Sequence, residues 1–136
     1  MTYNLFISHS WAYSDAYEKL LNLLDNAQYL SYTNLSVPKD DPIHNAPNQT
    51  LLYEAIKRQI LPAQVVLILS GVYASYSKWI DKEVEIAKRG FLSPKPILAI
   101  EPWGAEKTSQ FVKLSANKTV GWNTQSIVTA IRELAR

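Results

Sequence analysis

The chain has 136 residues, of which 47% are hydrophobic and 19% charged, a balance typical of one globular domain with a sizeable core, here residues 1–136. Its net charge of +2 comes without a basic run or basic repeat, which argues against a nucleic-acid-binding protein. There is no cysteine, which excludes disulfides and cysteine-based chemistry. The sequence also shows no signal peptide and no membrane-spanning run, so we expect a cytoplasmic protein with neither nucleic-acid nor membrane partners.

Five short segments are typical of strands. The clearest is a continuous run of β-branched and apolar side chains at residues 64–70, as found in parallel sheets that are covered on both faces. A second segment near residues 35–37 is rich in strand formers but has an uncertain register. The predicted strands span residues 3–8, 35–37, 64–70, 95–101 and 118–122.

Apolar residues recur at helical spacing between these strands. Helices are therefore predicted over residues 13–27, from Asn48 or Thr50 to residue 60, over residues 75–90 and 106–114, and from Asn123 or Thr124 onward. Residues 38–48 hold three prolines among polar side chains, which predicts a loop. A loop of this length is usually a binding loop, a lid or a disordered segment.

This alternation of strands and helices predicts an α/β fold. We expect a flavodoxin-like three-layer sandwich with a five-stranded parallel sheet in the order 2-1-3-4-5. Ligands of such sheets bind outside the carboxyl ends of the strands, here between the first and third strands. That position would bring together His9, Ser10 and Trp11, the 38–48 loop, and residues 70–77 with the helix that follows them.

The helix at residues 75–90 has well-marked ends. Ser75 or Ser77 is a suitable N-cap, and Gly90 stands where a left-handed C-cap residue would close the helix. Two of its acids have basic residues three or four positions away, which predicts surface ion pairs. These are Asp81 with Lys78, and Glu85 with Lys88 or Arg89.

Glu83 differs from these two acids. Its neighbours three and four positions away are apolar, so its carboxylate emerges beside the apolar face without a basic residue of its own helix nearby. These neighbours are Trp79, Ile80, Ile86 and Ala87. A carboxylate in this position is either functional or an accident of the helical register, because acids in such surroundings cluster at active sites but also occur in structural networks.

Several classes of protein are excluded or disfavoured by their missing motifs. With four glycines and neither G-x-G-x-x-G nor G-x-x-x-x-G-K-[ST], the chain has no dinucleotide-binding fingerprint and no P-loop. His9 and His44 lack metal-ligand spacing, and the G-x-S-x-G nucleophile elbow is absent. Asp40 and Asp41 are more often turn formers than cation ligands. Trp79 taken alone is more often a core aromatic than a stacking platform.

Four segments together resemble the TIR (Toll/interleukin-1 receptor) domain superfamily, and more narrowly the bacterial TIR-like proteins of the Thoeris antiphage system. They are the opening Leu5-Phe6-Ile7-Ser8-His9-Ser10, the proline-bearing loop, the strand Val65 to Ser70, and the run from Ser77 to Val84. The most specific element is W-x-x-x-E from Trp79 to Glu83. The 38–48 loop lacks the Arg-Asp-Pro-Gly pattern of receptor TIR domains, which argues against receptor-style signalling.

The resemblance implies an enzyme that cleaves NAD+ as its substrate, with no metal and no separate cofactor. It implies that Glu83 is the catalytic carboxylate, which stabilises the cationic sugar or grips its hydroxyls, and that a group of nearby side chains positions the dinucleotide. These are Phe6, Ser8, His9, Ser10, Trp11 and Trp79. The products would be nicotinamide and ADP-ribose or a cyclic ADP-ribose isomer, a diffusible signal that activates a partner effector. Activation by assembly into a homo-oligomer or filament is also implied.

Two other functions stay open. A non-catalytic TIR module would use the same fold for homotypic contacts, and a nucleoside deoxyribosyltransferase-like enzyme would also use a catalytic carboxylate on an α/β scaffold. Glu83 beside Trp79 favours the enzyme over the interaction module.

Overall fold

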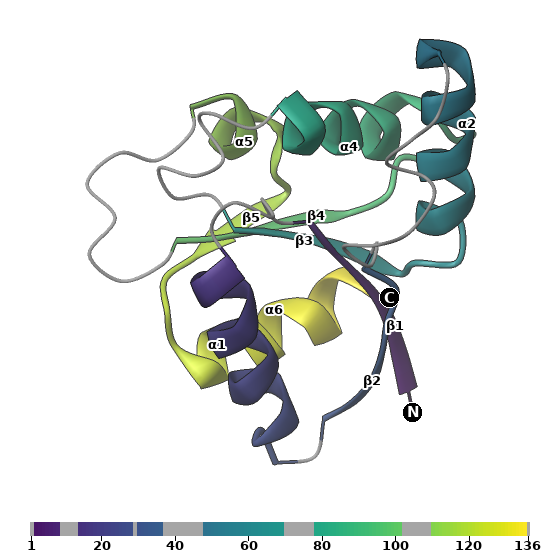
Figure 1. Ribbon diagram of the computed structural model, residues 1–136. Helices are drawn as coiled ribbons and strands as arrows, with labels where there is room; N and C mark the ends of the chain where they lie inside the picture. Colours follow the sequence, from purple (N-terminus) through teal and green to yellow (C-terminus); the bar gives the residue numbers. More distant parts are fainter. Residues whose placement is uncertain are drawn as a thin grey trace.

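In the computed structural model the described residues form a five-stranded parallel sheet with the order β2-β1-β3-β4-β5 (Figure 1). The structure describes residues 2–8, 14–28, 30–36, 48–69, 78–101 and 110–135, with the backbone alone at residues 14–16, 78, 79 and 110. The strands are β1 (Thr2–Ser8), β2 (Ser31–Asn34), β3 (Val65–Leu69), β4 (Ile97–Ile100) and β5 (Lys118–Val120). The helices are α1 (Ser14–Asp25), α2 (Gln49–Ile60), α4 (Lys78–Arg89), α5 (Gln110–Ser115) and α6 (Thr124–Leu134). The predicted flavodoxin-like α/β fold is thereby confirmed.

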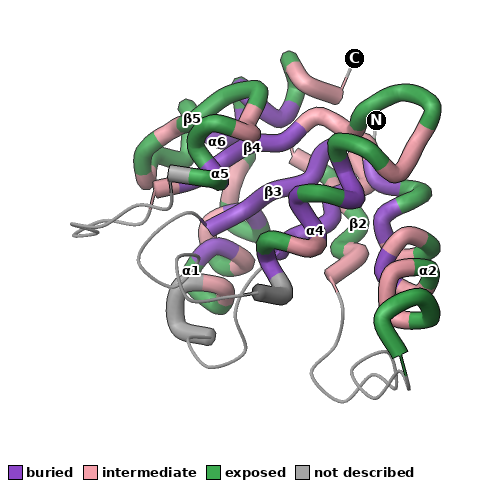
Figure 2. Tube along the Cα trace, turned by 90° about the horizontal axis from the view of Figure 1, so that it is seen from above, coloured by how far each residue is buried: buried purple, intermediate pink, exposed green. Residues whose placement is uncertain are grey.

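The helices cover both faces of the sheet, with α1 and α6 on one side and α2, α4 and α5 on the other (Figure 1). Because successive strand residues point to opposite faces, β1 sends Leu5 and Ile7 into the core beside α1 and α6, and Phe6 into the core beneath α2 and α4. β3 is buried at every position, as its continuous apolar sequence predicts (Figure 2). The central strands are therefore clamped between two apolar layers.

The second strand lies earlier in the chain than predicted. β2 runs over Ser31–Asn34 and pairs with the first half of β1, whereas residues 35–37 were the expected strand. The error arises because β2 is an edge strand with mostly exposed, polar residues, so it carries no apolar run to mark it. Leu35 still donates its N–H to the Leu5 carbonyl at 2.8 Å, and residue 37 lies outside the described part.

Asparagines cap two of the helices as predicted. Asn48 accepts a hydrogen bond from the Leu51 N–H at the start of α2, and Asn123 accepts one from the Ser126 N–H at the start of α6. The proposed N-caps of α4, at residues 75 and 77, lie outside the described residues. The described part of α5 covers Gln110–Ser115, and residues 106–109 of the predicted helix lie outside the described ranges.

Gly90 closes α4 in a different way from the one predicted. Its backbone is not in the left-handed region, so the expected C-cap conformation is wrong. Its N–H donates to the Ile86 carbonyl at 2.7 Å. A Cβ at this position would stand 2.6 Å from the same carbonyl oxygen and 3.2 Å from the Tyr53 hydroxyl. Glycine is needed here because the backbone passes too close to α4 for any side chain.

We therefore expect Gly90→Ala to lower the free energy of unfolding by about 1–3 kcal/mol, since the overlap involves a backbone atom that cannot rotate away. Gly121→Ala is the matched control, because a Cβ there meets nothing within 4 Å. That substitution should be neutral or slightly stabilising. Urea denaturation of both variants checks the expectation, and equal stabilities would contradict it.

Tyr32 on β2 predicts a pH dependence of stability. Its hydroxyl donates to Asp25 Oδ1 at 2.7 Å, and burial together with this acceptor raises the tyrosine pKa well above its usual value near 10. The folded state holds the tyrosine proton more tightly than the unfolded state does. This difference therefore contributes fully to the free energy of unfolding below pH about 10, and the contribution is lost as the pH rises further. We expect wild type to lose up to about 1 kcal/mol more than Tyr32→Phe between pH 9 and 11, allowing for solvent screening. Parallel losses in urea titrations would contradict this.

Candidate functional site

α4 carries a buried acid. Its apolar stripe faces the sheet, and Glu83 lies within that stripe with an exposed fraction of 1%. Ile80 and Val84, one turn before and one residue after it, are fully buried in the core beneath α2 and α4. The helical neighbours of Glu83 predict a carboxylate beside the apolar face of the helix, and in the structure the residue is buried in the protein.

The side chain of Ser8, 75 positions earlier in the chain, contacts this carboxylate. Its Oγ donates a hydrogen bond to Glu83 Oε1 at 2.6 Å, and Ser8 is itself 1% exposed. Ser8 is the last residue of β1 and pairs with Ile68 of β3, so the contact lies at the carboxyl end of β1 beside the third strand. This is the edge at which ligands bind in open parallel sheets, next to the point where the strand order reverses.

Phe6 is the nearest preceding residue on the same face of β1 as Ser8. It precedes Ser8 by two residues on the same face of β1, and its side chain is fully buried in the cluster that contains Ile80 and Val84. Phe6 is expected to contact substrate, whereas in the structure its side chain is enclosed by the core. In the described residues Phe6 packs in the core, and its role in contacting substrate stays a prediction.

The remaining expected site residues are not described. His9, Ser10 and Trp11 follow β1 directly, and the structure describes none of them. Trp79 is placed by its backbone in the first turn of α4, without its side chain. Residues 37–47 and 70–77, which follow β2 and β3, are also outside the described ranges. Whether these residues surround Glu83 stays a prediction.

The exposed acids of α4 behave differently from Glu83. Partial desolvation raises the pKa of the Asp81 carboxyl, in the first turn of the helix. Glu85 is exposed, and the predicted ion pair with Lys88 is wrong within the described residues. Lys88 instead donates from Nζ to the Ser115 carbonyl at the end of α5, at 2.8 Å, because a helix terminus offers unsatisfied carbonyl acceptors.

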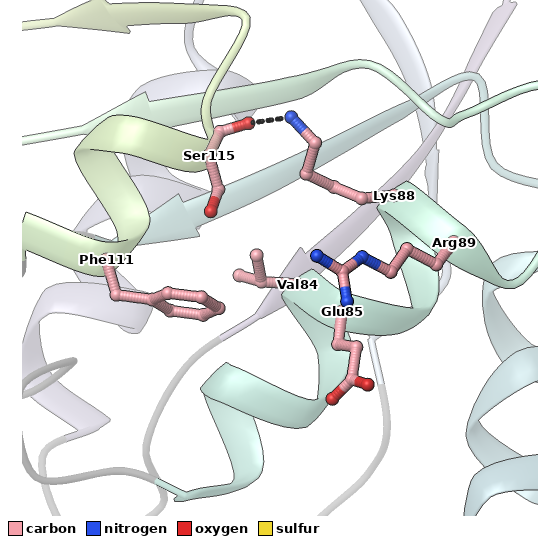
Figure 3. A pocket seen from close by; sticks show the side chains of 6 residues that line it. All are labelled: Val84, Glu85, Lys88, Arg89, Phe111 and Ser115. Atoms are coloured by element: carbon pink, nitrogen blue, oxygen red, sulfur yellow. Dashed lines mark hydrogen bonds between the residues drawn. The ribbon is translucent and has the colours of Figure 1, made fainter.

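A small pocket of about 230 Å³ lies between α4 and α5 (Figure 3). Val84 and Phe111 form its apolar walls, and charged side chains of α4 surround them. The lining residues are Val84, Glu85, Lys88, Arg89, Phe111 and Ser115. Neither Ser8 nor Glu83 borders this pocket, so it is separate from the buried acid.

The described residues also bear on metals and membranes. In residues 2–8, 14–28, 30–36, 48–69, 78–101 and 110–135, no three His, Cys, Asp or Glu side chains gather as metal ligands. Within the same ranges, none of the helices has the length and apolar character that crossing a bilayer requires.

The chemistry available at this edge is that of a buried, oriented carboxylate. Low local polarity strengthens the interaction of such a group with any positive charge that develops nearby. The apolar helical neighbours of Glu83 mark it as a candidate in the sequence, but nothing in the sequence predicts its serine partner. Both residues were named as site residues, yet no spacing rule connects positions 75 residues apart.

Comparison with known proteins identifies the family. The family model described as Thoeris protein ThsB, TIR-like domain, matches residues 6–107, a span that includes Ser8, Trp79 and Glu83. Among solved structures, FerB, a flavoenzyme NAD(P)H:(acceptor) oxidoreductase from Paracoccus denitrificans, aligns with a TM-score of 0.52 over 98% of this chain and 96% of that one. At 18% identity this likeness shows the fold alone. Comparison with curated proteins gave no match. The chain therefore belongs to the family of Thoeris protein ThsB, TIR-like domain, and is a TIR-like module of Thoeris antiphage defence.

Proposed function

We propose that this protein cleaves NAD+, releasing nicotinamide and forming ADP-ribose or a cyclic ADP-ribose isomer as a defence signal. The observation that carries the proposal is the Glu83 carboxylate, buried and hydrogen-bonded to Ser8 at the carboxyl end of β1. Membership of the Thoeris TIR-like family supports the same reaction class. The substrate is NAD+ itself, and the proposal includes no metal and no separate cofactor.

The proposed reaction breaks the bond between the ribose C1′ and the nicotinamide nitrogen. The bonding electron pair leaves with nicotinamide, which becomes neutral, and positive charge builds on the ribose as an oxocarbenium-like centre. Glu83 stabilises that charge electrostatically or grips the ribose hydroxyls. Because the carboxylate lies in a water-poor setting, its effect on the developing charge is larger than in bulk solvent.

The ribose centre is then captured by a nucleophile. Water gives ADP-ribose and one proton, whereas a hydroxyl or ring nitrogen of the same molecule gives a cyclic isomer. We propose that His9, Ser10, Trp11 and Trp79, at the end of β1 and the start of α4, hold the dinucleotide and decide between these outcomes. The product would act on a separate effector, which fits a module of a multi-component defence system.

Incubation of the purified protein with NAD+ tests the proposal, with nicotinamide and the nucleotide product followed by chromatography and mass spectrometry. Runs at graded protein concentrations, with and without a crowding agent, cover activation by assembly, and light scattering reports the assembly itself. Nicotinamide release that scales with enzyme is the expected result. An assembled protein that leaves NAD+ intact would overturn the proposal.

The same experiment separates the two alternative functions. Release of free base from deoxynucleosides, with NAD+ untouched, would indicate a deoxyribosyltransferase-like enzyme. Self-association without turnover of either substrate would indicate a non-catalytic interaction module. The buried acid favours an enzyme over that module, because an adhesive surface draws on exposed side chains.

A further inference from the structure

We infer that Ser8 is a positioning residue that holds the Glu83 carboxylate in its working orientation, rather than a residue that contacts NAD+. The inference rests on the proposed function. It also changes the role that the family resemblance implies for Ser8, from substrate contact to support of the catalytic acid.

The hydroxyl proton of Ser8 is already committed. A serine hydroxyl has one proton to give, and Ser8 gives it to Glu83 Oε1 at 2.6 Å. A hydrogen bond of this length to a carboxylate is among the stronger ones in proteins. A ribose hydroxyl that needs a donor would therefore have to break the bond to Glu83.

Both residues of this hydrogen bond are anchored in buried parts of the fold. Ser8 ends β1, where it is paired with Ile68 of the fully buried β3. On α4, Glu83 lies between Ile80 and Val84, which pack into the same core cluster as Phe6. A glutamate side chain has three rotatable bonds, and a fixed donor at one carboxylate oxygen limits how that group turns.

The orientation of the Glu83 carboxylate should affect the rate of the chemical step. Catalytic groups work when they are held close to the geometry of the transition state, and a displacement of about 1 Å can cost about 100-fold in rate. Removing the donor should leave substrate binding intact while the carboxylate samples unproductive orientations. The loss should therefore fall on kcat and not on KM, which is the opposite of the pattern for a lost substrate contact.

The kinetic test compares three variants with wild type: Ser8→Ala, Ser8→Thr and Ser31→Ala. Ser8→Ala should lower kcat for nicotinamide release about tenfold or more and change KM less than about twofold. Ser8→Thr keeps the hydroxyl and should recover most of the rate. Ser31→Ala, which removes a strand hydroxyl bonded to the neutral Thr2 side chain, should behave as wild type. A raised KM with unchanged kcat, or no effect of Ser8→Ala, would overturn the inference.

A thermal unfolding cycle keeps this test separate from the proposed function. The losses in melting temperature of Ser8→Ala and Glu83→Ala should be non-additive, so that the double variant loses less than the sum of the two single losses. Coupled melting temperatures in a protein that leaves NAD+ intact would mean that the proposed function fails although the pair is real. Additive losses would mean that Ser8 does not hold Glu83, whatever the activity.

Discussion

Replacing Glu83 by glutamine is expected to reduce nicotinamide release from NAD+ by at least about 100-fold, corresponding to about 3 kcal/mol of lost transition-state stabilisation. The substitution removes the negative charge but keeps an amide oxygen where Oε1 accepts from Ser8. The fold should therefore survive, with a melting temperature close to that of wild type. Initial rates by chromatography and a thermal melt of the same samples provide the measurement.

Glu85→Gln is the matched control, because it removes the same charge from the same helix at an exposed position. We expect its rate to stay within about twofold of wild type, since exposed charges are well screened by water and salt. If Glu83→Gln retained the wild-type rate, Glu83 would be removed from the mechanism. If both variants lost activity equally, the effect would come from the charge of α4 and not from the buried acid.

The second large effect is expected on stability. Phe6→Ala should lower the free energy of unfolding by about 3–5 kcal/mol, because the phenyl ring is fully buried in the cluster between β1, α2 and α4 and its removal leaves a cavity. For a domain of this size that loss is a large fraction of the total stability. Urea denaturation followed by circular dichroism measures it.

Phe111→Ala provides the comparison for Phe6, since Phe111 lies on α5 and is 46% exposed as a residue. Its removal should cost less than about 1 kcal/mol. Similar losses in the two variants would contradict the packing role of Phe6. A Phe6→Leu variant that folds and shows a strongly raised KM for NAD+ would instead return Phe6 to the group of residues that touch the substrate.

The fold was predictable wherever burial leaves a pattern in the chain. β3 and α4 were recognised because one is apolar at every position and the other is apolar along one stripe. β2 was misplaced because an edge strand needs no apolar residues. The left-handed C-cap predicted at Gly90 is wrong because a glycine after a helix can have either of two causes. Either the backbone needs a positive φ or a neighbouring atom leaves no room for a Cβ, and the sequence does not distinguish them.

The candidate site was predictable in part. The place of Glu83 beside the apolar face of its helix followed from the identity of its helical neighbours, whereas its inward direction is seen only in the structure. The predicted strand order brought the end of β1 to the same edge of the sheet. The hydrogen bond to Ser8 could not be predicted from the sequence, because it depends on the position of α4 along the sheet and on the direction of the helix axis. Packing of Ile80 and Val84 against the strands sets both of these quantities.

The distance along the chain between Ser8 and Glu83 has a consequence during biosynthesis. On a translating ribosome the first strand emerges long before the acid that it will hold, because 75 positions separate Ser8 from Glu83. Closing so long a loop is slow compared with local helix formation. A nascent polypeptide that ends before α4 lacks the acid altogether, so under the proposed function it could not cleave NAD+.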